Sequence, residues 1–175
     1  LVMLPTEHGG WAFLGEPILL GLLVAFSWSG ALIAVAALAG YVARQPLRLF
    51  VADRRRGRRY PRTAMAERGF AACVLLAAAA VAGAVALGDR RSMFALGALA
   101  PLAAAAFAFD LGQRSRAAAA EVCAALSLAG LATAIALADG WPLAQAFGLW
   151  AALAGRVIPT IVYVRARLRL ERGEP

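Results

Sequence analysis

The sequence RQPLRLFVADRRRGRRYPRTAMAER, residues 44–68, carries nine of the 18 arginines of this 175-residue chain. Only Asp53 and Glu67 oppose them within it, and long runs of Ala, Leu, Val and Gly flank it on both sides. Basic segments beside apolar spans stay on the cytoplasmic side of a membrane and orient the neighbouring helices. Residues 44–68 are therefore predicted to form a basic cytoplasmic loop at the membrane interface of an integral membrane protein.

The composition of the whole chain agrees with this prediction. The chain is 62% hydrophobic, with a mean hydropathy of +0.72, whereas a soluble domain is about 45–50% apolar. No polar linker divides the chain, so residues 1–175 are predicted to form a single transmembrane domain. Arginines next to apolar spans fit contact with the bilayer and its anionic phospholipids. They do not fit nucleic acid, because a soluble scaffold with base-stacking aromatic residues is not visible.

The apolar runs predict an all-α, polytopic transmembrane helix bundle. A spanning helix needs about 20 apolar residues. The predicted spans are residues 11–28, 30–43, 64–87, 92–109, 117–137 and 142–164. Because Trp28-Ser29-Gly30 is a poor helix centre, we expect two helices before the basic loop. If Trp11–Ala43 is one span instead, the bundle has five helices.

The distribution of arginine sets the orientation. With six spans, one side of the membrane holds residues 44–68, Arg114, Arg116 and the arginines of residues 165–172, and the other holds only two, in residues 90–91. The positive side is cytoplasmic. Both termini are therefore predicted to be cytoplasmic, and the protein to be multi-pass; with five helices the N-terminus would be outside.

Polar residues near the N-terminus form one group of candidates. Glu7 and His8, the only histidine, precede the first span, where they would transfer protons or bind a substrate. The alternative is a solvated segment that caps the first helix.

The basic segment offers a second group of candidates. Arg44 and Arg48 lie four residues apart and would share one face of an extended second helix, with Gln45 and Asp53 nearby. Converging guanidinium groups bind phosphate, so these four residues are substrate-binding candidates. Asp53 would pair with an arginine three residues on or act as a ligand. Alternatively, the arginines serve only as a topological anchor.

The connector DLGQRSRAAAAE, residues 110–121, supplies a third group. Asp110, Arg114 and Glu121 form one stripe if the segment is helical, although Gly112 interrupts it. Asp110 and Arg114 are substrate-binding candidates and Glu121 a catalytic one. The alternative for Glu121 is structural pairing with an arginine of this connector or of a neighbouring helix.

The last span supplies a fourth group, because Arg156, Thr160 and Tyr163 share one helix face with Pro159 and Arg167. All three are substrate-binding candidates. Arg156 lies well inside the span, so it is expected to face the protein interior or a water-filled cavity. The alternative is a buried Arg–Glu pair that holds the bundle together.

Four blocks of the sequence resemble the YwiC-like family of bacterial inner-membrane proteins. They are PTEHGGWAFLGEPILLGLL, RQPLRLFVADRRRGRRYPRT, RSRAAAAE and GRVIPTIVYVRARLR. The resemblance implies a bacterial cytoplasmic (inner) membrane location and further hydrophobic segments beyond this C-terminus, so that the chain would be truncated. The family has no established activity to carry over.

The layout is also similar to that of UbiA-type intramembrane prenyltransferases, which bind prenyl diphosphates through magnesium and Asp-rich motifs. Here the corresponding loop holds only Asp53, amid arginines. No metal site and no cofactor are therefore expected; magnesium would require Asp53 and Asp110 to converge. The single His and two separated Cys make no ligand cluster.

Three functions remain open. The first is an enzyme or binder with a cytoplasm-facing, Arg-rich chamber for an isoprenoid phosphate or phospholipid. The second is a structural or accessory membrane subunit. The third, a small transporter, is disfavoured because the outer half of the membrane holds few polar residues, among them Ser27, Ser29, Thr133 and Gln145.

Overall fold

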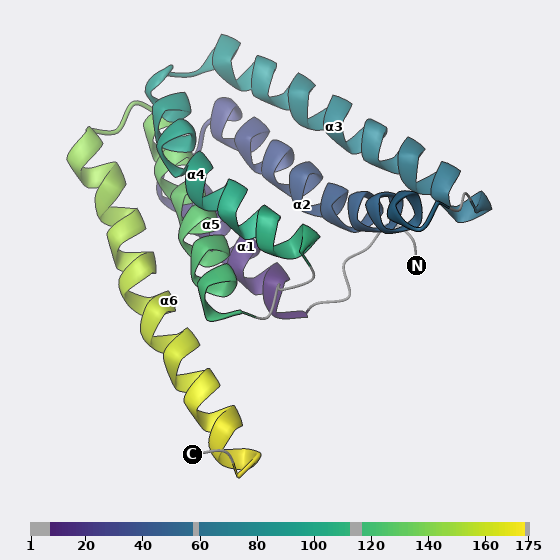
Figure 1. Ribbon diagram of the computed structural model, residues 1–175. Coiled ribbons are helices and arrows are strands. Elements are labelled where there is room, and N and C mark those ends of the chain that lie inside the picture. The colour runs from purple at the N-terminus through teal and green to yellow at the C-terminus, as the bar shows by residue number, and fades with distance from the viewer. Residues whose placement is uncertain (1–7, 58–59, 113–116, 174–175) are drawn as a thin grey trace.

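Six α-helices make up the protein in the computed structural model, which describes residues 8–57, 60–112 and 117–173 (Figure 1). The helices are α1 (His8–Val24), α2 (Trp28–Arg55), α3 (Pro61–Leu87), α4 (Arg91–Leu111), α5 (Ala118–Ala138) and α6 (Leu143–Glu171). Five of them, α2 to α6, are long and apolar enough to cross a membrane, and α1 is a shorter apolar helix. The predicted all-α, six-helix membrane bundle is confirmed.

The break between the first two helices lies at residues 25–27, so the five-helix alternative is wrong. Ser27 has an extended backbone and its hydroxyl accepts a hydrogen bond from the backbone N–H of Gly30 at 3.0 Å. This is an N-cap, which satisfies one of the free N–H groups at a helix start. The break therefore has a local cause in the sequence.

The basic segment is helical at both ends, which corrects the prediction of a loop over residues 44–68. α2 continues to Arg55 and α3 starts at Pro61. Gly57 has a φ of +64°, which a turn between the two helices requires and which glycine adopts without strain. Pro61 occupies the first turn of α3, where its missing N–H costs nothing. At 1.5 Å per residue, α2 is about 42 Å long and exceeds the hydrocarbon thickness of about 30 Å.

α5 is the centre of the bundle and packs against α1, α2, α4 and α6. Residues 129–138 of α5 are buried without exception. Small residues allow this close approach: a Cβ on Gly130 would lie 1.8 Å from Leu99 Cδ1 of α4, and one on Gly30 would lie 2.8 Å from Ile135 Cγ2. Small residues at helix contacts are the usual basis of packing in a membrane.

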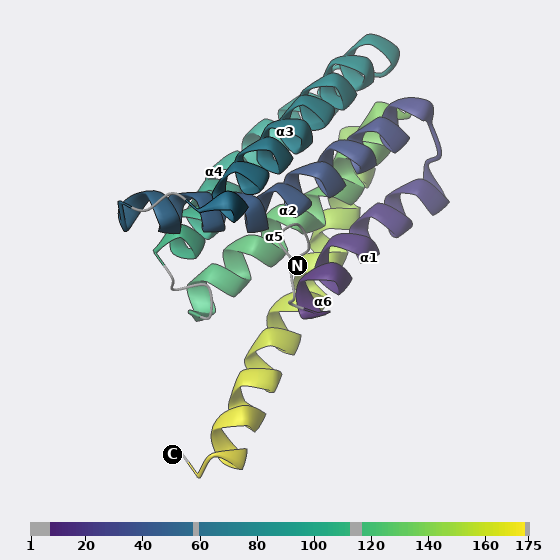
Figure 2. The same ribbon diagram turned by 90° about the vertical axis from the view of Figure 1, so that its right-hand side faces the viewer.

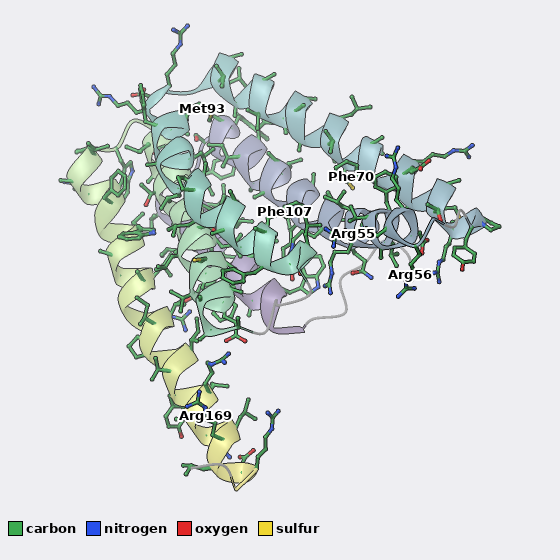
Figure 3. All side chains as sticks on the ribbon, viewed as in Figure 1. Arg55, Arg56, Phe70, Met93, Phe107 and Arg169 are labelled. Atoms are coloured by element: carbon green, nitrogen blue, oxygen red, sulfur yellow. The ribbon has the colours of Figure 1, made fainter. Side chains whose placement is uncertain are left out.

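α2 and α3 lie side by side along most of their length (Figures 1 and 2). α3 is largely exposed elsewhere, with apolar side chains such as Leu75 and Leu76 on its outer surface. Such a face suits contact with lipid. The C-terminal part of α6 extends beyond the other helices in both views, and it carries Arg169 (Figure 3).

The basic end of the bundle is formed by the starts of α1, α3 and α5 and the ends of α2, α4 and α6. The helices alternate in direction along the chain, so these six ends lie toward the same side of the bundle (Figures 1 and 2). The opposite end holds the turn with Arg90 and Arg91. Thus the polar segments that were singled out from the sequence lie at or toward one end.

Candidate functional site

Asp110 is the anchor of the most densely charged contact at the basic end. Its side chain is 1% exposed, at the last turn of α4. The Nε and Nη2 atoms of Arg44 donate hydrogen bonds to its Oδ2 at 3.2 and 3.1 Å. Arg48 Nη1 forms an ion pair with Oδ1 at 3.5 Å. One buried carboxylate of α4 therefore holds two arginines of α2.

A third arginine reaches the same end of α4. Arg55 Nη1 donates a hydrogen bond to the backbone carbonyl of Leu111 at 3.2 Å, and Figure 3 shows Arg55 at the end of α2. Arg44, Arg48 and Arg55 are spaced at i, i+4 and i+11, which places them on one face of a helix. We call these three residues the arginine cluster.

The start of α1 packs against Tyr41, on whose ring Arg44 lies. Its guanidinium carbon lies 5.3 Å from the ring centroid of Tyr41, a cation–π distance. Tyr41 is buried and its ring packs edge-on against Trp11 at 4.9 Å. A Cβ on Gly10 would lie 2.0 Å from the Tyr41 hydroxyl, so only glycine fits there. Tyr41 thus lies between α1 and Arg44, while Asp110 of α4 binds Arg44 directly.

The arginine cluster is partly open to solvent. Among the described contacts of its three guanidinium groups are the carboxylate of Asp110 and the backbone carbonyl of Leu111. The side chains of Arg44 and Arg48 remain 28% and 36% exposed, and Arg55 is exposed. Arginine presents planar, fixed donors that match carboxylate or phosphate oxygens. This arrangement can bind an additional anion, with Asp110 holding the donors in place.

Asp53 lies on the opposite face of α2 and belongs to a different contact. Its buried carboxylate accepts hydrogen bonds from Arg62 Nη2 at 3.0 Å and from the Thr63 hydroxyl at 2.8 Å, both on α3. Arg56, three residues on, was the predicted partner of Asp53. The observed partner is Arg62, because α3 folds back along α2. Asp53 and Asp110 therefore bind different arginines and do not converge on one magnesium position.

Glu121 pairs with α6, which confirms its predicted structural pairing with an arginine. Arg165 Nη1 donates to Glu121 Oε2 at 2.9 Å. The predicted stripe through Asp110 and Glu121 is wrong, because α4 ends at Leu111 and α5 begins at Ala118. Arg114, the third member of that stripe, lies outside the described residues.

Arg156 forms an Arg–Glu pair with Glu16 of α1, as its structural alternative predicted, but the pair is not buried, so Arg156 does not face the protein interior. The two side chains are 54% and 38% exposed. The buried face of α6 is formed by residues such as Val157 and Ile161. Thr160 and Tyr163 are exposed with Arg156 on another face, and the Thr160 hydroxyl donates to the Arg156 carbonyl.

The remaining candidates are placed as follows. Glu7 lies outside the described residues; His8 begins α1, but its side chain is not among those described. Gln45 is half-buried beside Arg44. Within the described part of the chain, no three His, Cys, Asp or Glu side chains lie close enough to hold a metal ion. The polar residues are divided among separate helix pairs, and a common chamber stays a prediction.

Several members of these contacts could not be identified as partners from the sequence. The predicted interfacial loop over residues 44–68 does not single out Arg55 from the other arginines of that segment. Its i+11 spacing from Arg44 was the available signal. Arg62 and Thr63 were missed because they become partners of Asp53 only once α3 folds back.

Comparison with known protein families gives a match over most of the chain. The family model described as YwiC-like protein matches residues 4–136, which cover α1 to α4 and most of α5. α6 lies outside the matched region. No curated protein and no solved structure matches the chain.

Proposed function

The chain belongs to the YwiC-like family, and from its arginine cluster we propose that it is a membrane protein that binds the phosphate head group of an anionic lipid. The proposed site is at the basic end, which would face the cytoplasm across a bacterial inner membrane with both termini on that side. A phospholipid or an isoprenoid phosphate would supply the head group. The proposal concerns binding and does not depend on Glu7, His8 or Glu121 as catalytic groups.

The observation that carries this proposal is the attachment of two arginines to one buried carboxylate. Arg44 and Arg48 thereby present two guanidinium groups beside the same carboxylate, and both remain partly exposed to a ligand. Packing against Tyr41 and bonding to Asp110 hold Arg44 in one orientation. A preorganised donor loses less conformational entropy when a ligand binds.

The depth of the cluster favours a lipid over a soluble ligand. Arg44 follows Trp28 by 16 residues, or about 24 Å along α2. A hydrocarbon core is about 30 Å thick, so a helix that enters at Trp28 places Arg44 near the opposite boundary. Lipid phosphates lie at this boundary. The apolar outer surfaces of the neighbouring helices would accommodate the acyl chains.

Lipid binding by the purified protein tests the proposal. The informative variant is the triple change Arg44→Gln, Arg48→Gln and Asp110→Asn, because it removes two of the cluster's three positive charges without leaving the buried carboxylate unpaired. We expect the triple variant to bind phosphatidic acid at least about tenfold more weakly in native mass spectrometry. Arg90→Gln, at the opposite end, is the control and should bind as the wild type does. Equal binding by the triple variant would overturn the proposal.

A structural or accessory role is the second candidate, and a specific observation favours it. Each of the carboxylates Glu16, Asp53, Asp110 and Glu121 pairs with an arginine of another helix. These pairs link α1 to α6, α2 to α3, α2 to α4 and α5 to α6. If they serve only to hold helices together, the triple variant will be less stable but will bind lipid normally.

A further inference from the structure

The ion pair between Glu16 of α1 and Arg156 of α6 lies on the outer surface of the bundle, at the depth of the hydrocarbon core. Arg156 follows Leu143, the first residue of α6, by 13 residues, or about 20 Å. The hydrocarbon core is about 30 Å thick, so Arg156 lies within it. Charged groups at this depth normally face a protein interior or a water-filled cavity. We propose that a second copy of the chain covers this pair and packs against α1 and α6 in a two-fold symmetric dimer.

The pair has the capacity to bind polar groups of a partner. Its hydrogen bond joins Nη2 of Arg156 to Oε2 of Glu16. A guanidinium has five N–H donors and a carboxylate has two oxygens, so this bond engages only part of that capacity. Both side chains are exposed, and a polar group without a partner is costly in lipid. A partner that brings its own charged groups therefore stabilises this surface more than acyl chains do.

Charge complementarity identifies a second copy as that partner. Two copies with the same orientation in the membrane form a closed dimer about a two-fold axis along the membrane normal. The pair joins two neighbouring helices, so its positive and negative charges lie side by side. Half a turn about the normal then brings Arg156 of each copy opposite Glu16 of the other. In the dimer each guanidinium lies between two carboxylates.

A lipid head group fits this surface less well than a second copy does. Arg156 would attract a phosphate, but the carboxylate of Glu16, which is bonded to Arg156, would repel it. Acyl chains offer neither donors nor acceptors. The surface thus differs from the arginine cluster in the class of partner that it suits.

The helix faces around the pair are open to a second copy. On α1, Leu19 and Leu23 are exposed and lie on one stripe with Glu16, at i+3 and i+7. On α6, Gly155 is exposed, and no described atom lies within 4 Å of an ideal Cβ at this position. Small residues allow membrane helices to approach closely. The apolar side chains of α1 would surround the four charges and exclude water from them.

Charge reversal tests the pairing between copies. Glu16→Arg leaves two arginines at the site, and Arg156→Glu leaves two carboxylates. Each variant alone should dimerise at least about tenfold more weakly than wild type, because like charges then face each other. A mixture of the two variants should form a heterodimer, because each supplies the charge that the other lacks. Native mass spectrometry of the purified full-length proteins, with tags of different mass, counts the copies.

Gly155→Leu provides a second test that does not depend on a reversed charge. The space around Gly155 accommodates a leucine in the single chain, whereas the added bulk keeps two copies apart. We expect dimerisation at least about tenfold weaker than in wild type, with unchanged helix content by circular dichroism. Gly97→Leu is the matched control, because Gly97 of α4 is equally open. This control should dimerise as wild type does.

The outcomes decide for or against the dimer. A monomeric wild type would overturn it, and so would trimers or larger assemblies. If Gly155→Leu dimerises as well as Gly97→Leu does, the copies do not meet at this face and the proposal is wrong. A mixture of folded charge-reversed variants that forms no heterodimer would overturn the cross-pairing. Lipid binding by the arginine cluster is a separate measurement, because the cluster lies on α2.

Discussion

Arg44 and Asp110, 66 residues apart in the sequence, connect α2 to α4 through two hydrogen bonds to a single carboxylate oxygen, Oδ2. The other oxygen, Oδ1, is buried and has Arg48 at ion-pair distance. Burial of a carboxylate is costly unless the group is paired and hydrogen-bonded, and the two arginines provide these partners. The pair is therefore a structural contact that also orients the proposed anion site.

The first prediction concerns the stability that Asp110 provides. Asp110→Asn keeps the shape of the side chain but removes the charge that Arg44 and Arg48 share. We expect the free energy of unfolding to fall by about 1–3 kcal/mol, less than for a fully buried pair because both arginines are partly exposed. Thermal unfolding in detergent measures it.

Asp139 provides the matched control, because it is an exposed aspartate at the end of α5 on the opposite side of the bundle. Asp139→Asn should change the stability by no more than about 0.5 kcal/mol. An equal loss in both variants would show that Asp110 has no special role.

The helices of this protein could be predicted from the sequence, whereas most contacts between their polar side chains could not. Apolar runs of sufficient length predict the number of spans, because the backbone N–H and C=O groups inside a membrane must find their hydrogen-bond partners within the protein, as they do in a helix. The charge pattern likewise located the polar residues at one end. The partners of those residues depend on how helices rotate about their axes, and the apolar faces are too uniform to determine that rotation.

Arg156 is the clearest example. The helical period correctly placed Arg156 on one face of α6 with Thr160 and Tyr163. The period did not show that this face is exposed and does not pack against α5. Asp53 is similar, since its partners come from the following helix. The apolar contacts of Val157 and Ile161 decide the rotation of α6, and the sequence alone does not distinguish them from the exposed Ile158 and Val162.

The second prediction concerns the pair that joins α1 to α6. Glu16→Gln and Arg156→Gln each leave one charge without its partner near the apolar phase, so each should lower the melting temperature. The double variant should lose less stability than the two single variants lose together. The difference is the coupling free energy of the pair, expected at about 0.5–3 kcal/mol.

Arg167→Gln is the comparison for this cycle. Arg167 pairs with Glu171 on the exposed end of the same helix, four residues on. Its loss should change the stability by only about 0.3–0.5 kcal/mol. If the effects of Glu16→Gln and Arg156→Gln on stability are additive, the pair contributes nothing to the stability of the protein.

The third prediction concerns the close contact between the end of α3 and the start of α2. A Cβ on Gly88 would lie 2.6 Å from Ser29 Cβ and 2.2 Å from its hydroxyl oxygen, which donates to the Ala84 carbonyl. Gly88→Ala should destabilise the protein by about 1–3 kcal/mol, because Ser29 cannot move without losing that bond. Thermal unfolding measures the change.

Gly97 of α4 offers the opposite case, since no atom lies within 4 Å of its ideal Cβ. Gly97→Ala should be neutral or stabilising, by up to about 1 kcal/mol, because glycine is unfavourable inside a helix. Similar destabilisation by both changes would contradict the packing explanation for Gly88.

The fourth prediction concerns the connection of α2 to α3. Thr63 donates to Asp53 and its hydroxyl accepts the backbone N–H of Tyr60. Thr63→Val keeps the shape and removes both bonds, so it should cost about 1.5–3 kcal/mol. Ser127→Ala, which removes a hydroxyl bonded within its own helix, should cost less than half as much. Equal costs would indicate that the bond to Asp53 is unimportant.

The fifth prediction concerns the side of the membrane that the basic end faces. Arg56 and Arg90 are both exposed, on turns at opposite ends of the bundle. In a background without the native thiols Cys73 and Cys123, Arg56→Cys and Arg90→Cys each place one thiol outside the spans. The excess of arginine is expected to keep the basic end in the cytoplasm. An impermeant maleimide should then label the Arg90→Cys variant in intact bacterial cells. It should label the Arg56→Cys variant only in inverted membrane vesicles. The reverse pattern would place the arginine cluster on the outer face, and the cytoplasmic location proposed for lipid binding would then be wrong.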